Sequence, residues 1–224
     1  MSTLNKKLNE IGVTKEIIII NAVLILAGFF GMLNQMLLSP ALPSIMVDMN
    51  VDASTVQWLT TGYMLMSGIM VPVTAFLLDR FTTRRLFFVA MGMFTAGTFT
   101  AAISTDFSVI MLARVLQAAG CGIMMPMGQV IMLITIPRQF RGTAMGLIGI
   151  VFGVAPCIGP VVGGLIVDMF DWHMLFYGLV PFCLLTIIVA FFYLENFGEP
   201  KKVSLDIPSV ILSFSLQQPC GKKN

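Results

Sequence analysis

The sequence predicts an all-α integral membrane protein whose six spanning helices form two inverted three-helix repeats. Three observations lead to this prediction. Of the 224 residues, 57% are hydrophobic and only 11% are charged, whereas a soluble domain has about 25% charged residues. Six long apolar runs follow one another along the chain. The basic residues occupy alternate connections between these runs, as expected for a chain that crosses a bilayer repeatedly.

Each run is long enough to cross a membrane, because a helix needs about 20 mostly apolar residues to span the hydrocarbon. Lipid offers no partners to backbone groups, so runs of this length are predicted to be helices rather than strands. The first run is too long for a cleaved signal peptide, and further spans follow it. In chain order the runs cover residues 17–38, 56–78, 86–104, 109–136, 144–167 and 175–194.

The distribution of charge sets the predicted orientation. The first, third and fifth connections contain no Lys or Arg. The positive-inside rule therefore places the N-terminus and the end of the sixth span in the cytoplasm of a multi-pass protein of the cell membrane. Residues 1–16 are then a cytoplasmic tail and residues 17–195 a six-span body. Ten basic residues mark the cytoplasmic side: Lys6, Lys7, Lys15, Arg80, Arg84, Arg85, Arg138, Arg141, Lys201 and Lys202.

A faint internal repeat relates spans one to three to spans four to six. When the chain is shifted by 89 positions, segment 75–88 falls on segment 164–177, and Asp79 meets Asp168. The two segments lie on opposite predicted sides of the membrane, as in the inverted repeats of transporters. Four identities in fourteen positions could also arise by chance in so apolar a chain.

The fifth run carries a set of small and helix-bending residues that share one helical face. Small residues allow close helix approach in lipid, and proline removes a backbone donor and bends a helix. The set predicts a bent helix pressed against a partner, either as ordinary close packing or as a hinge or seal. We call it the glycine stripe: Gly149, Gly153, Pro156, Gly159, Pro160, Gly163 and Gly164.

Polar side chains inside the apolar runs are the candidate pathway residues. Arg114 is the only basic residue within a run. A charge in the hydrocarbon costs about 2.5–3.5 kcal/mol by insertion scales, so such a residue indicates function, with a structural tether as the alternative. Gln117 lies one turn further on the same face. Asn34 and Gln35 lie deep in the first run, where an amide can bind substrate or bond a neighbouring helix.

Other function classes find no support in the sequence. No metal-ligand set, nucleophile motif or phosphate-binding loop is present, so no enzyme, metal or cofactor is predicted. The four cysteines show no paired spacing, and a net charge of +2 gives no reason to expect nucleic acid. The expected driving force is then an ion gradient, most simply of protons.

Five motifs resemble those of the major facilitator superfamily, and especially its fourteen-span drug:proton antiporters. GVAPCIGPVVGG (153–164) resembles the antiporter motif of the fifth span, and LARVLQAAG (112–120) the fourth-span motif. SPALPSI (39–45) and DWHMLF (171–176) resemble the end of the first span and the start of the sixth. AFLLDRFTTRR (75–85) resembles the cytoplasmic motif after the second span: Asp79, Arg80, Arg84 and Arg85 match, and Ala75 and Thr82 replace glycines.

This resemblance covers about residues 17–213 and implies the N-terminal half of the major facilitator fold. It implies efflux of a small amphipathic molecule by proton antiport with alternating access, and proton coupling at Arg114. Asp79 and Arg80 would form a gating charge clamp, or else a simple headgroup anchor. Asn34 stands where the drug antiporters usually have Asp, which puts proton binding in the first span in doubt. His173, the only histidine, is interpreted as an interfacial residue rather than a pH switch.

Residues 196–224 are interpreted as a cytoplasmic loop and an incomplete seventh span with an aberrant end. The apolar run 207–216 is too short, at 1.5 Å per residue, to cross about 30 Å of hydrocarbon. We therefore expect a truncated half-transporter, whose polar pathway residues face lipid until a missing C-terminal half or a second copy covers them. The alternatives are a six-span carrier or channel that dimerises, and an inactive fragment that binds a partner.

Overall fold

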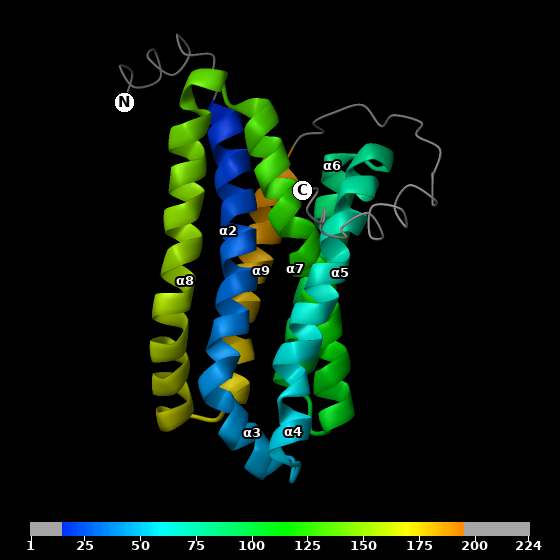
Figure 1. Cartoon of the computed structure of the whole chain (residues 1–224), viewed down its shortest axis with the longest axis vertical. Helices are drawn as coiled ribbons and strands as arrows, with labels where there is room; N and C mark the ends of the chain where they lie inside the picture. The colour runs from blue at the N-terminus through cyan, green and yellow to red at the C-terminus, as the bar shows by residue number, and fades with distance from the viewer. Residues whose placement is uncertain (1–14, 195–224) are drawn as a thin grey trace, which may run out of the picture.

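The computed structural model describes residues 15–194, and these residues form a bundle of long helices (Figure 1). Six helical segments within this range are long and apolar enough to cross a membrane, which confirms the predicted fold class. In chain order the elements are α2 (Lys15–Leu38), η1 (Ser39–Ala41), α3 (Leu42–Asp48), α4 (Ala53–Val56), α5 (Trp58–Arg80), α6 (Thr83–Ala102), α7 (Phe107–Thr135), η2 (Arg138–Phe140), α8 (Arg141–Met169) and α9 (His173–Tyr193).

Each long helix extends beyond its predicted apolar run at one or both ends. α7 and α8 have 29 residues each, or about 43 Å at 1.5 Å per residue, more than the hydrocarbon requires. The first span continues through η1 and α3 to Asp48. Two residues of the predicted tail, 15 and 16, belong to α2; the rest of the tail and the predicted seventh span lie outside the described residues.

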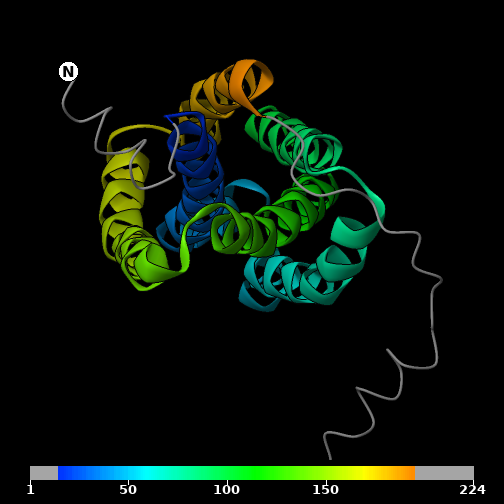
Figure 2. The same cartoon turned by 90° about the horizontal axis from the view of Figure 1, so that it is seen from above.

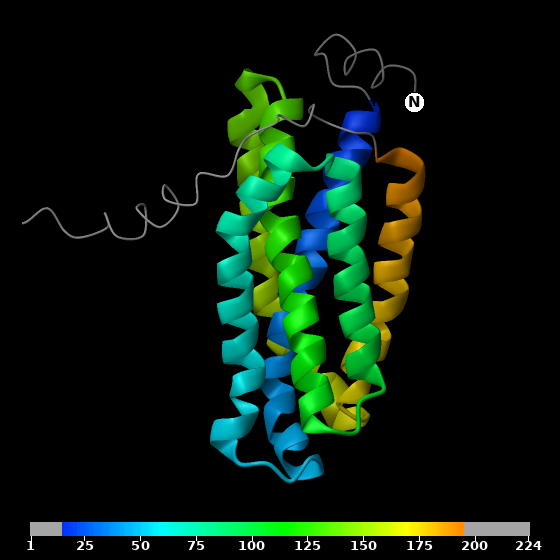
Figure 3. The ribbon, with the colours of Figure 1, turned by 90° about the vertical axis from the view of Figure 1, so that its right-hand side faces the viewer.

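The connections alternate between two ends of the bundle (Figure 3). The α5–α6 and α7–η2–α8 connections, which carry the arginines, lie at what we call the basic end. The α3–α4, α6–α7 and α8–α9 connections lie at the opposite end, which we call the acidic end because it carries five aspartates and no Lys or Arg. These are Asp48, Asp52, Asp106, Asp168 and Asp171.

The two repeats exchange their first helices. α2 packs against α8 and α9 of the second repeat, whereas α7 packs against α5 and α6 of the first. α2 and α7 also contact each other in the middle of the bundle (Figure 2). Phe81 and Phe170, which the shift of 89 positions relates, both follow a helix end in extended conformation. Each also bonds its N–H to the carbonyl four residues earlier.

The buried apolar side chains form two clusters, one toward each end. The cluster of the basic end includes Leu24, Phe87 and Met127, and that of the acidic end includes Ile45, Ile110 and Phe176. On α7 the change from one cluster to the other falls between Ala113 and Ala118. Arg114 and Gln117 lie in this interval, so a polar layer separates the two clusters.

Candidate functional site: a buried arginine network

Arg114 is completely buried between the helices. Its NH1 donates to Gln117 Oε1 at 2.8 Å, and its Nε donates to the Leu59 carbonyl at 3.4 Å. The guanidinium carbon lies 4.3 Å from the centre of the Tyr63 ring, which is a cation–π geometry. Among residues 15–194 no carboxylate forms an ion pair with Arg114. An amide, a carbonyl and an aromatic face therefore hold this desolvated cation.

Gln117 extends the network from α7 to α6. Its Nε2 donates to Thr98 Oγ1 at 3.1 Å, and Thr98 Oγ1 donates to the Phe94 carbonyl at 2.7 Å. Because the Thr98 proton is used on that carbonyl, the hydroxyl oxygen must accept from Gln117. The Gln117 amide is thereby fixed with its oxygen toward the guanidinium, which makes Thr98 a positioning residue for the arginine.

Tyr63 connects the network to α2, since its hydroxyl donates to the Gly31 carbonyl at 3.1 Å. The sequence predicted Arg114 and Gln117 together, but it gave no reason to select Tyr63 or Thr98. Helical periodicity relates residues of one helix only. A hydroxyl within an otherwise apolar run is the available signal, and many such residues merely bond their own helix, as Thr186 does at the Phe182 carbonyl.

Two buried donors of the predicted pathway have no hydrogen-bond partner among the described residues. They are Arg114 NH2 and Asn34 Nδ2. A buried unpaired donor costs about 1–3 kcal/mol, and more when it is charged, so each favours an acceptor group that reaches it. Gln35 is only half-buried. The expectation that Arg114, Gln117 and Asn34 face lipid in a single half is wrong, because α5, α6 and α7 enclose the first two and Asn34 is 2% exposed.

The predicted gating residues lie together at the basic end but form no charge clamp there. Asp79, Arg80 and Arg85 are exposed, and no ion pair joins Asp79 to an arginine within residues 15–194. Arg84 turns toward α9 instead. Its NH2 donates to the Phe191 carbonyl at 3.0 Å, and its guanidinium lies 5.6 Å from the Phe191 ring centre. This contact places a cation at the C-terminal end of α9, where the helix dipole is negative.

The glycine stripe of α8 is divided between two environments. Gly159 and Gly163 are buried against α2 and η1, and a Cβ at Gly163 would lie 2.6 Å from the Leu37 carbonyl oxygen. A Cβ at Gly149, Gly153 or Gly164 would have no neighbour within 4 Å. Among the described residues, the predicted close contact is therefore present at Gly159 and Gly163 and absent at the other three glycines. Only the edge of the stripe is packed.

Comparison with known proteins finds one matching family and relatives named as transporters or resistance proteins. The sequence profile of the Major Facilitator Superfamily matches residues 24–216. The uncharacterized MFS-type transporter YcnB of Bacillus subtilis is 47% identical over 195 residues, and the lincomycin resistance protein LmrB of the same species is 42% identical over 190 residues. These alignments cover 87% and 85% of this chain but 41% and 40% of the relatives. The chain thus spans about two-fifths of their length.

A solved structure shares the fold. A crystal structure of the peptide transporter POT in complex with sulfate superposes with a TM-score of 0.73 at 14% identity. The match covers 90% of this chain and 43% of that chain. At this level of identity the similarity concerns the fold alone, and it supports the same two-fifths relation in length.

Proposed function

This chain belongs to the major facilitator superfamily, and from that premise we propose that it forms one half of an exporter. The exporter moves small amphipathic molecules, drugs among them, in exchange for protons. The observation that carries this proposal is Arg114, a fully buried cation without a carboxylate partner in the described chain. The relative named as a lincomycin resistance protein supports drugs as the substrate class.

Arginine keeps its proton in proteins, so Arg114 would act on a group that faces it. Its unpartnered NH2 can form a charge-assisted hydrogen bond with an ionised acid. That bond stabilises the ionised form and releases the acid's proton. An acid of the substrate or of a second helical body would then lose its proton when it reaches Arg114 and regain it on leaving. This alternation is what coupling between substrate and protons requires.

We propose that the faces of α5 and α8 dock the second six-helix body around which alternating access occurs. Only 11% of the most apolar stretch of Ala53–Arg80 and 17% of that of Arg138–Met169 are buried within this chain. The corresponding value for α7 is 61%. The open glycines of α8 favour a close helix contact at that face, with a second copy of this chain as the alternative partner.

Proton coupling is tested by replacing Arg114 in a full-length transporter that carries residues 15–194. In proteoliposomes, Arg114→Ala should abolish drug-dependent proton flux, measured with a pH-sensitive dye. Arg114→Lys should retain part of the flux, because the charge remains but the fork geometry does not. Arg138→Ala, at an exposed arginine of the basic end, is the matched control and should transport normally.

Size-exclusion profiles show whether each variant is folded. Unchanged flux in a folded Arg114→Ala variant would reduce Arg114 to a structural tether and remove the basis of the coupling proposal.

The proposed orientation places the basic end and the N-terminus in the cytoplasm. Without the native cysteines, Asp52→Cys and Thr105→Cys should react with an impermeant thiol reagent in intact cells. Thr82→Cys and Gln139→Cys should react only after lysis, because the positive-inside rule keeps the arginine-bearing connections inside. Labelling of position 82 or 139 from outside would invert the orientation.

A further inference from the structure

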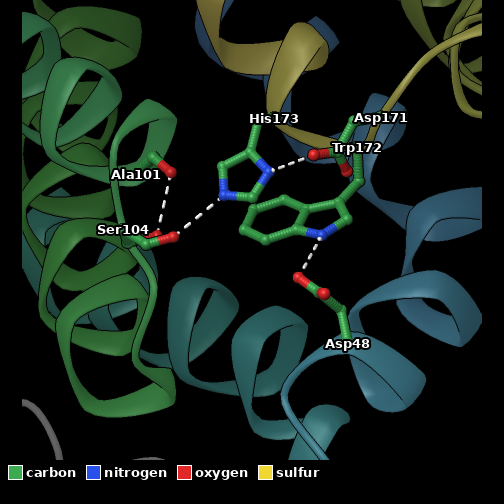
Figure 4. Close-up of polar contacts among 6 residues, drawn as sticks. All are labelled: Asp48, Ala101, Ser104, Asp171, Trp172 and His173. Atoms are coloured by element: carbon green, nitrogen blue, oxygen red, sulfur yellow. Dashed lines mark hydrogen bonds and ion pairs between the residues drawn. The ribbon is translucent and has the colours of Figure 1, made fainter.

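The histidine at the start of α9 bonds two acceptors at once (Figure 4). His173 Nδ1 lies 2.8 Å from Asp171 Oδ2, and Nε2 lies 2.9 Å from the Ser104 carbonyl oxygen. Ser104 belongs to the connection between α6 and α7. The contact therefore joins α9 to the α6–α7 pair at the acidic end. The two bonded residues are 69 positions apart in the chain.

The chemistry of the two partners fixes the proton count of the ring. A backbone carbonyl can only accept, and an ionised carboxylate can only accept. Each ring nitrogen must then carry a hydrogen, whereas a neutral imidazole has a hydrogen on only one of them. The arrangement in Figure 4 therefore gives each ring nitrogen an acceptor, which an imidazolium satisfies at both nitrogens and a neutral imidazole at only one.

The surroundings of the ring add to this preference. Trp172 stacks on the imidazole with ring centres 3.6 Å apart, and an aromatic face attracts a cation. The Trp172 indole is fixed in turn, because Nε1 donates to Asp48 Oδ2 of α3 at 3.1 Å. The Ser104 hydroxyl donates to the Ala101 carbonyl at 2.9 Å. The Ser104 carbonyl is thus held just beyond the C-terminus of α6, at the negative end of that helix dipole.

The other titratable groups near the ring are mostly acidic. Asp171 bonds it directly, Asp48 lies behind Trp172, and Asp106 lies two residues beyond Ser104. Tyr177 lines the same open pocket of about 390 Å³ as His173 and Asp171. The positive end of the α9 helix dipole lies at its N-terminus and repels a cation at this position. The directly bonded Asp171 carboxylate offsets this repulsion.

We propose that His173 is a proton-binding site at the acidic end, on the predicted extracellular side, and that its proton fastens α9 to the α6–α7 connection. The open pocket gives water, and so protons, access to the ring. Loss of the proton leaves one ring nitrogen with a lone pair directed at an acceptor. Either the Asp171 or the Ser104 contact is then lost. The contact is therefore present while the ring carries its proton and is lost together with it.

This protonation can be observed directly, because the chain has a single histidine. In the purified full chain labelled with ¹⁵N-histidine, both ring nitrogens should show the protonated signal at about pH 5. One of them should move to the unprotonated position at about pH 8. A ring with only one protonated nitrogen across this whole range would overturn the proposal.

A second readout uses the stacked tryptophan. Trp58→Phe leaves Trp172 as the only tryptophan of the chain, and an imidazolium stacked on it should quench its fluorescence. The fluorescence should rise with pH, and His173→Gln should remove the transition. Asp171→Asn should move the midpoint, because the charged ring loses its carboxylate partner. Asp168→Asn, at the end of α8, is the matched control and should leave the midpoint unchanged.

A fluorescence transition that survives in His173→Gln, or a midpoint that moves equally in Asp168→Asn and Asp171→Asn, would contradict the proposed site. These measurements need no transport, so their failure is distinguishable from a failure of the antiport proposal.

Discussion

α7 and α8 have the same length of 29 residues, and each contains proline and several glycines. Yet α7 is enclosed by its own chain, whereas α8 is packed along one edge only. The difference follows from their places in the repeat. α7 is a first helix and lies between the second and third helices of the other repeat, whereas α8 is a second helix on the periphery. Glycine content therefore does not by itself show how much of a helix is packed within the described residues.

The largest expected effect is on the glycine contacts of the two helices. A Cβ at Gly122 of α7 would lie 2.7 Å from Met70 Cβ and 2.9 Å from the Ser67 carbonyl oxygen, whereas one at Gly149 of α8 meets nothing within 4 Å. Overpacking costs about 1–3 kcal/mol, and more where backbone must move. Gly122→Leu should therefore lower the thermal unfolding midpoint clearly, as followed by circular dichroism.

Gly149→Leu is the matched substitution on α8 and should leave the midpoint unchanged or raise it, since leucine has the better helix propensity by about 1 kcal/mol. Equal losses in the two variants would mean that α8 is as tightly packed within this chain as α7.

A smaller effect on stability is expected from the buried hydrogen bonds between α7 and α6. No such network is present on α8 among the described residues. Thr98→Val leaves Gln117 Nε2 without its acceptor, and a buried unpaired donor costs about 1–3 kcal/mol. Thr100→Val is the control on the same helix, because the Thr100 hydroxyl bonds only the Ala96 carbonyl one turn away. Thermal unfolding should separate the two variants, and indistinguishable midpoints would show that Thr98 does not position Gln117.

The smallest effect concerns the acidic-end caps. Asp52 accepts hydrogen bonds from Ser54 Oγ at 2.6 Å and from Thr55 N at 3.0 Å. The hydrogen bond from Ser54, and then those from Thr55, lower the pKa of the Asp52 carboxyl below its usual value. Its contribution to stability is therefore present above the usual aspartate pKa and is lost as the pH falls through the lowered one. Asp106, which precedes α7, forms no such side-chain bond.

Asp52→Asn should accordingly reduce the acid dependence of the unfolding midpoint slightly, and Asp106→Asn should not change it. Unfolding scans at a series of acidic pH values provide the measurement. Identical acid dependence in the Asp52→Asn variant and the unchanged protein would rule out this cap as a source of stability.

The sequence alone predicts features that depend on the surrounding lipid or on the spacing of residues within a single helix. Lipid selects long apolar runs, so the six spans could be predicted, although the continuation of the first span to Asp48 was not. The pairing of Arg114 with Gln117 followed from helical spacing alone. The partners from other helices, Tyr63 and Thr98, could not be predicted, because which faces meet depends on the packing of the whole bundle.

Two features depend on contacts between elements that the sequence does not reveal. The glycine stripe was treated as one contact surface, but α2 covers only the edge that includes Gly159 and Gly163. His173 bonds the Ser104 carbonyl of another connection, a contact that its position in the sequence does not predict. Hydrogen-bond acceptors on the backbone carry no sequence signal, so a side-chain contact to a carbonyl is visible only in the fold.

The packing of α2 against the second repeat also affects the order in which contacts can form during synthesis. α2 is synthesised early, yet the helices that cover it, α8 and α9, begin about 100 residues after it ends. At translation rates of about 5–20 residues per second, α2 waits roughly 5–20 s for its partners. During that interval Asn21 lacks its bond to Thr135. The first repeat therefore leaves the ribosome before the helices that cover most of α2 have been synthesised.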